Sequence, residues 1–144
     1  MSLRPLLALA FSAIFLSIVP NVHAAETLKL VPPPDMSKLP PAQAGELRKA
    51  RADFEKSVPL LAGDALAESY AVIGEAYAQN GFYDAANVAF EDATRLAPKD
   101  GHWVYALGVI AQIQKHPAVA QNYFGLAFQL TPDYLPIRVA VAQG

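Results

Sequence analysis

The sequence of 144 residues is first notable for what it lacks. It has no cysteine, which excludes disulfides, thiolate zinc sites, iron–sulfur clusters, covalently attached haem and a lipoprotein anchor. The formal net charge is only −2, so the composition points to neither nucleic acid nor an anionic membrane as a partner. The length is sufficient for one small domain.

The residue patterns that carry catalysis are missing as well. There is no Gly-rich phosphate loop and no His-Glu-x-x-His motif. His102 and His116 would lie about 21 Å apart on one straight helix, at 1.5 Å per residue, so they could not share a metal ion. Ser57 and Ser69 have no accompanying histidine and acid in a recognisable pattern. The sequence therefore predicts a protein that is not an enzyme, with no catalytic residues, no metal site and no cofactor.

One apolar run is present, and it is short. Residues 6–19 follow the basic Arg4 and form an apolar segment of about 14 residues, whereas a membrane-spanning helix needs about 20. Pro20 ends the run, and small or neutral residues follow up to Ala24. Residues 1–24 therefore read as a signal peptide that is cleaved after Ala24, and the mature protein is expected to be exported, most simply to a bacterial periplasm. The alternative is that the segment is retained as an anchor.

Residues 25–41 hold five prolines and are predicted to form an extended linker. This linker could be a recognition strip for a partner, a spacer, or a strap across the first helix. Residues 42–64 are predicted to contain a capping helix at 42–58, with its apolar positions on one face, followed by a turn. Asp64 is expected to cap the next helix.

The strongest pattern is a repeat with a period of 34 residues, in which residues 67–100 correspond to residues 101–134. A large apolar residue followed by glycine recurs as Ile73-Gly74 and Leu107-Gly108. Each pair would allow a close approach between two helices. The ten matched positions are Gly74, Ala86, Phe90, Ala93, Pro98, Gly108, Ala120, Phe124, Ala127 and Pro132. Proline at the last position of each unit would end its second helix.

These residues and this spacing resemble the tetratricopeptide-repeat family, with the lead segment similar to the start of longer exported bacterial members. The resemblance implies an all-α helix-turn-helix solenoid with an N-terminal capping helix. The helices of the first repeat are expected at about 65–79 and 83–96. Those of the second repeat are expected at about 102–115 and 117–130. Gly81 suits a left-handed helix end, and Pro117 suits the first position of a helix.

The resemblance also implies a concave groove lined by the first helix of each repeat. Carried over by register, the first repeat contributes Glu68, Ala71, Val72, Glu75 and Gln79, and the second contributes His102, Tyr105, Ala106, Val109, Gln112 and Ile113. Tyr105 is the residue we expect to matter most, because an aromatic side chain on a rigid helix buries area at low entropic cost. Trp103 is expected to be partly buried where the two repeats meet.

These expectations predict a non-catalytic scaffold or adapter of the cell envelope that binds a protein or peptide partner in the groove. They predict no nucleic-acid partner and no stable membrane span after signal cleavage. Residues 135–144 begin a third repeat register but are mostly apolar. This segment could be a lid, an edge that docks on a partner or on a second copy, or the start of a third repeat in a longer protein. The alternative function is accordingly a structural assembly subunit that stacks through this end.

Overall fold

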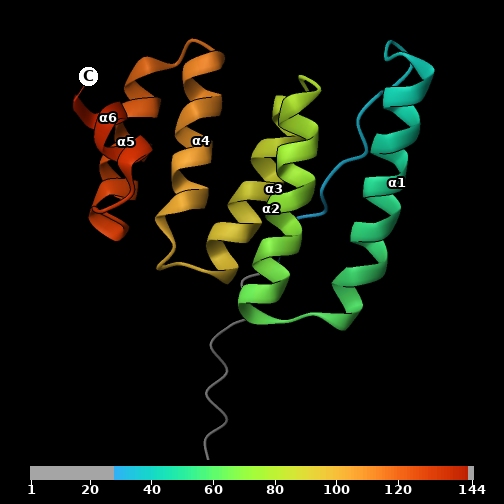
Figure 1. Cartoon of the computed structure of the whole chain (residues 1–144), viewed down its shortest axis with the longest axis horizontal. Helices are drawn as coiled ribbons and strands as arrows, with labels where there is room; N and C mark the ends of the chain where they lie inside the picture. Colours follow the sequence, from blue (N-terminus) through green and yellow to red (C-terminus); the bar gives the residue numbers. More distant parts are fainter. Residues whose placement is uncertain (1–27, 143–144) are drawn as a thin grey trace, which may run out of the picture.

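The computed structural model describes residues 28–142, which form six α-helices and no strand. The helices are α1 (Pro41–Ser57), α2 (Gly63–Gln79), α3 (Tyr83–Leu96), α4 (Gly101–Ile113), α5 (Pro117–Leu130) and α6 (Leu135–Ala142), with one 3₁₀ turn at Val58–Leu60 (Figure 1). The predicted all-α fold is therefore confirmed. The predicted signal peptide, residues 1–24, lies outside the described residues.

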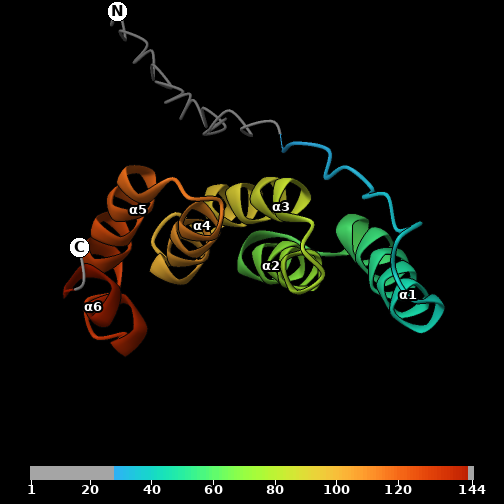
Figure 2. The ribbon, with the colours of Figure 1, turned by 90° about the horizontal axis from the view of Figure 1, so that it is seen from above.

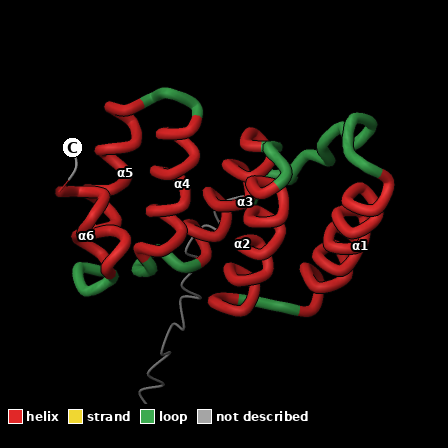
Figure 3. The backbone as a smooth tube through the Cα atoms, turned by 45° about the horizontal axis from the view of Figure 1, so that its top comes forward, coloured by secondary structure: helices red, strands yellow, loops and turns green. Residues whose placement is uncertain are grey.

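The helices are arranged as two antiparallel hairpins with one helix added at each end. α2 packs most extensively on α3, and α4 packs most extensively on α5. Weaker contacts between α3 and α4 join the hairpins, while α1 rests on α2 and α6 rests on α5. Figure 2 shows the helices following one another across the molecule, and Figure 3 shows that short loops connect them. Each unit thus contacts chiefly its neighbours, as in a solenoid.

Glycine allows the two helices of each hairpin to approach closely. Gly74 of α2 faces the ring of Phe90, and Gly108 of α4 faces the ring of Phe124. A Cβ atom at Gly74 would lie 3.2 Å from Phe90 Cζ, and one at Gly108 would lie 2.5 Å from Phe124 Cε1. Both rings are almost fully buried. The predicted pairing of glycine with phenylalanine therefore corresponds to a direct contact in both repeats.

The turns between the paired helices share one backbone conformation but not one residue type. Gly81 ends the first helix of the first repeat with φ +80°, in the left-handed region. Lys115 occupies the equivalent place in the second repeat with φ +62°. A residue with a Cβ atom is strained there, whereas glycine is not. Pro117 follows at the first turn of α5, as predicted.

The prediction that Asp64 caps α2 is wrong. The helix begins two residues earlier than predicted, at Gly63, and its N-cap is Ala62, which makes no capping hydrogen bond through its side chain. Asp64 lies inside the first turn, where its negative charge still interacts favourably with the helix dipole. Gly63 has φ +55°, a left-handed backbone conformation that favours glycine.

A contact between two hydroxyls and a contact between two aromatic rings hold α1 against α2. The ring of Phe54 meets the ring of Tyr70 edge-on, with centroids 4.9 Å apart. Ser57 Oγ donates to the Phe54 carbonyl at 2.8 Å, so the 2.5 Å contact between the two hydroxyls is one in which Ser69 donates to Ser57. The predicted capping helix therefore covers α2 of the first repeat.

The proline-rich segment forms an ordered strap, defined here as residues 28–39. Val31 is only 2% exposed and belongs to the main core cluster. Its carbonyl accepts a 2.8 Å hydrogen bond from Arg51 Nη1 of α1, and the same nitrogen lies 3.2 Å from the hydroxyl of Tyr77 in α2. Of the three possibilities raised for this segment, the structure shows a strap that joins the capping helix to the first repeat.

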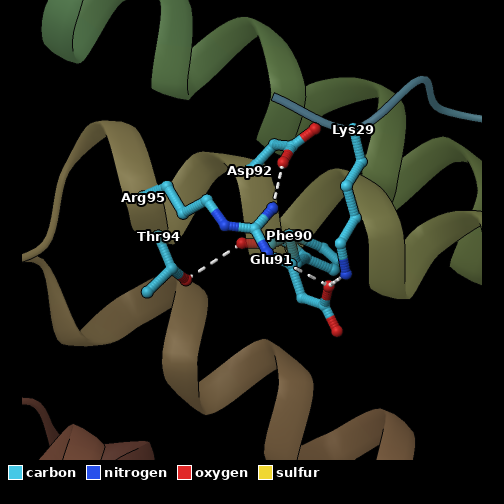
Figure 4. A network of polar contacts seen from close by, with 6 residues as sticks. All are labelled: Lys29, Phe90, Glu91, Asp92, Thr94 and Arg95. Carbon is cyan, nitrogen blue, oxygen red and sulfur yellow. Dashed lines mark hydrogen bonds and ion pairs between the residues drawn. The ribbon is translucent and has the colours of Figure 1, made fainter. Parts of the chain in front are cut away.

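The start of the strap is tied to α3 by charged groups (Figure 4). Lys29 Nζ pairs with the carboxylate of Glu91. Beside it, Asp92 is fully buried, and its Oδ1 accepts from Arg95 Nη1 at 2.5 Å. Burial raises the pKa of Asp92, opposed by hydrogen bonding from the Lys29 backbone amide and from Arg95. Asp92 Oδ2 has no hydrogen-bond partner among residues 28–142, so this carboxylate is incompletely satisfied in its ionised form.

Candidate functional site

A groove of about 410 Å³ lies between the first helices of the two repeats, and we call it the α2–α4 groove. Its walls come from α2 and α4, with contributions from α3 and from the loop before α6. The lining residues are Glu75, Ala78, Gln79, Tyr83, Phe90, His102, Trp103, Tyr105, Ala106, Val109, Ile110, Ile113 and Tyr134. Most of these side chains are apolar or aromatic, which is typical of a binding site for peptides or small molecules.

An aromatic cluster stiffens one end of the α2–α4 groove. The ring of Tyr105 lies 5.5 Å from that of Phe124 and 5.9 Å from that of Tyr134, the latter edge-on. His102 also meets Tyr134 edge-on, at 4.5 Å. Burial raises the pKa of the Tyr105 hydroxyl, helped by the nearby Tyr134. Tyr105 is therefore neutral and held in place before any ligand arrives.

A hydrogen-bonded pair fixes the orientation of His102. Asp100 is the N-cap of α4, and its Oδ1 accepts from the backbone amide of His102 at 2.9 Å. The same oxygen lies 2.5 Å from Nδ1 of the imidazole. A protonated Nδ1 donates to the carboxylate in this geometry. The contact holds the ring against Tyr134 at the mouth of the groove, where it can stack on a ligand.

The α2 side of the groove supplies polar and acidic groups. Glu75 and Gln79 are exposed and lie one turn apart on α2. Opposite them, Ile113 is 49% exposed, an unusual degree for an isoleucine on a rigid helix. The groove therefore presents a carboxylate and an amide on one wall and apolar surface on the other.

Seven of the eleven residues predicted to line a groove line this one together: Glu75, Gln79, His102, Tyr105, Ala106, Val109 and Ile113. Ala71 does not, and its assignment is corrected: it is 1% exposed and packs in the core, so a partner cannot reach it. Glu68 and Val72 line a different groove, between α1 and α2. Gln112 is exposed but lies outside the groove lining.

The sequence analysis missed several lining residues. Tyr134 comes from the loop after the second repeat, and only the folding of the chain brings it to His102. Trp103 lies at the junction of the repeats and is partly buried, as expected, but it also reaches the groove. Ala78 and Ile110 lie within the predicted helices, and finer tracking of the helical period could have included them.

The described residues offer little support for other kinds of site. Within residues 28–142 there is no group of three or more His, Asp or Glu side chains that could hold a metal ion. In the same part of the chain, no helix is both long enough and apolar enough to cross a bilayer.

The stacked hairpins, the glycine–phenylalanine contacts and the groove between first helices define an all-α helical-repeat protein. The family model of the Tetratricopeptide repeat matches residues 67–100, the same 34 residues that the period assigned to the first repeat. The chain therefore contains a tetratricopeptide repeat at residues 67–100. No curated protein matches the sequence. Repeats of this family are generally non-catalytic scaffolds, and their presence suggests a role in protein–protein interaction.

Proposed function

We propose that the protein is an exported, non-catalytic adapter that binds a segment of a partner protein in the α2–α4 groove. The observation that carries this proposal is the groove itself: a preformed cavity with a rigid aromatic end at Tyr105 and Tyr134. In protein interfaces a few residues carry most of the binding energy, and tyrosine is among the residue types enriched at those positions.

The chemistry of the groove indicates the kind of segment it would take. Apolar side chains of the partner would lie against Tyr105, Val109 and Ile113, and a basic side chain would meet Glu75. An amphipathic helix or an extended peptide with one lysine or arginine beside apolar anchors meets both requirements. The proposed site in the cell envelope rests on residues 1–24, whose composition is that of a signal peptide.

Photo-crosslinking in cells tests the proposed groove. A photoreactive residue at Tyr105 should give a discrete heteromeric product, and mass spectrometry would name the partner. The matched control is the same residue at Leu30, which is 85% exposed on the strap and does not line the groove. Equal products from both positions would mean that the labelling reports collision rather than binding, and the groove would lose its support.

Fractionation and N-terminal sequencing test the proposed export separately. The mature protein should be recovered from the periplasmic fraction with Ala25 as its first residue. Recovery of the uncleaved chain in the cytoplasm would refute export and leave the groove proposal standing. An uncleaved chain in the membrane fraction would show a retained anchor instead.

A further inference from the structure

In the 34-residue period, Val141 of α6 corresponds to a position in the first helix of a repeat. That position normally packs against the second helix, which follows it in the chain. Val141 lies two periods after Ile73 and one period after Leu107. Ile73 is 1% exposed and Leu107 is 4% exposed, because each lies in a first helix covered by the second helix of its repeat. Val141 is 38% exposed, and Leu135 and Val139 of the same helix are 65% and 45% exposed. Within the described residues, this face of α6 is uncovered.

The other end of the described chain shows the opposite situation, a second helix without a first helix beside it. In α1, Ala50, Phe54 and Ser57 have nearly the spacing that Ala86, Phe90 and Ala93 have in α3. α1 therefore resembles the second helix of a repeat. The segment that precedes it in the described chain is the strap, which is extended rather than helical. No first helix of that unit is present among residues 28–142.

A second groove marks the place that such a first helix would occupy. This α1–α2 groove has a volume of about 550 Å³, and no residue of the strap lines it. Ala50, Phe54 and Ser57 form its α1 side. On the α2 side, Val72 is 55% exposed and Leu61, in the preceding loop, is 37% exposed. The lining is predominantly apolar, so leaving it in water is unfavourable.

The charges of the two surfaces are complementary. The α1–α2 groove carries three carboxylates, on Glu46, Asp53 and Glu68, and one cation, Lys49. Lys49 is already paired with Asp53, at 2.6 Å. α6 carries a single charged residue, the exposed Arg138. A helix that brings apolar side chains and one guanidinium suits an apolar groove with surplus negative charge.

We propose that the α1–α2 groove binds α6 of a second copy of this chain. In this arrangement, α6 takes the place of the first helix that is not found beside α1 among residues 28–142, and α1 covers the face of Val141. The two surfaces differ, so the contact is heterologous, and a pair of copies still has one free groove and one free α6. Repeated contacts then extend the solenoid from copy to copy. This interface goes beyond the proposed partner groove and uses different side chains.

Two single substitutions and their mixture test the interface. Val141→Asp places a charge on the docking face of α6, and Val72→Arg places one in the groove, where it also repels Arg138. Both positions are exposed, so both variants should fold with unchanged helicity by circular dichroism. Leu30→Arg is the control, since Leu30 is 85% exposed on the strap and lines neither surface. Sedimentation equilibrium over a concentration series measures the molar mass.

We expect the unmodified protein and Leu30→Arg to form species larger than dimers as concentration rises, and each interface variant to stay monomeric. An equimolar mixture of the two variants should form a dimer and nothing larger, because the intact α6 of Val72→Arg fits the intact groove of Val141→Asp. An unmodified protein that stays monomeric overturns the proposal. A Val72→Arg variant that still associates also overturns the proposal, since α6 would then pair with itself. A mixture of the two variants that remains monomeric overturns it as well.

Discussion

The contact between Gly108 and Phe124 offers the sharpest test of how the repeats are packed. A methyl group at position 108 would lie 2.5 Å from Cε1 and 2.6 Å from Cδ1 of the Phe124 ring, whereas ordinary contact begins at 3.4 Å. Phe124 is 2% exposed, so its ring cannot swing out into solvent. Gly108→Ala must therefore move the ring, or the whole of α5, by close to an ångström.

The magnitude follows from two opposing effects. Inserting a methyl group into a well-packed core typically costs about 1–3 kcal/mol. Replacing glycine by alanine inside a helix returns about 1 kcal/mol. At Gly108, where the overlap is severe, the upper part of the cost applies, and we expect a net loss of about 1–2 kcal/mol. At Gly74 the methyl group would lie 3.2 Å from Phe90 Cζ, so a small shift suffices and Gly74→Ala should be close to neutral.

Urea denaturation followed by circular dichroism measures these differences, and Gly125→Ala is the matched control. Gly125 lies in the middle of α5, and a Cβ atom there would have no neighbour within 4 Å. That substitution should stabilise the protein by about 1 kcal/mol. The expected order of stability is Gly125→Ala, then the unmodified protein with Gly74→Ala, then Gly108→Ala. A Gly108→Ala protein as stable as Gly125→Ala would refute the packing of α4 on α5.

Three further predictions concern the turn, the buried acid and the core. Lys115→Gly should stabilise the protein by about 1 kcal/mol, because Lys115 has φ +62° at the position that Gly81 occupies in the first repeat. An unchanged urea midpoint would contradict the left-handed turn. The stability of Asp92→Asn relative to the unmodified protein should rise with pH. Burial raises the pKa of Asp92 in the folded state, so below the unfolded value of about 4 both states are protonated and no difference arises. As pH rises through the higher folded pKa, the protein must ionise a buried carboxyl and loses stability that the asparagine variant keeps. Urea unfolding across acid pH checks this, and a pH-independent difference would contradict it. Phe90→Ala should cost about 3–5 kcal/mol, whereas Tyr105→Ala should cost less and chiefly weaken partner binding. If thermal melts show the reverse order, the groove has been assigned to the wrong face.

The sequence alone determined the repeat and the helices, because those features are set by short-range chemistry. Pro98 ends one unit, Gly81 permits a left-handed turn, and the pattern of apolar residues repeats at the helical period. The limits predicted for α3 and α5 coincide with those observed. Glycine at 74 and 108 indicated close helix pairs, since the absence of a side chain allows two helices to approach each other.

Only the tertiary structure decided which side chains a partner can reach. The crossing of successive helices buries Ala71 and exposes Val72, although both are neighbours on one helix. The path of the chain after α5 brings Tyr134 to the groove, and the strap follows its course because Val31 finds a place in the core. Such outcomes depend on contacts between residues far apart in the sequence, and packing in three dimensions determines those contacts.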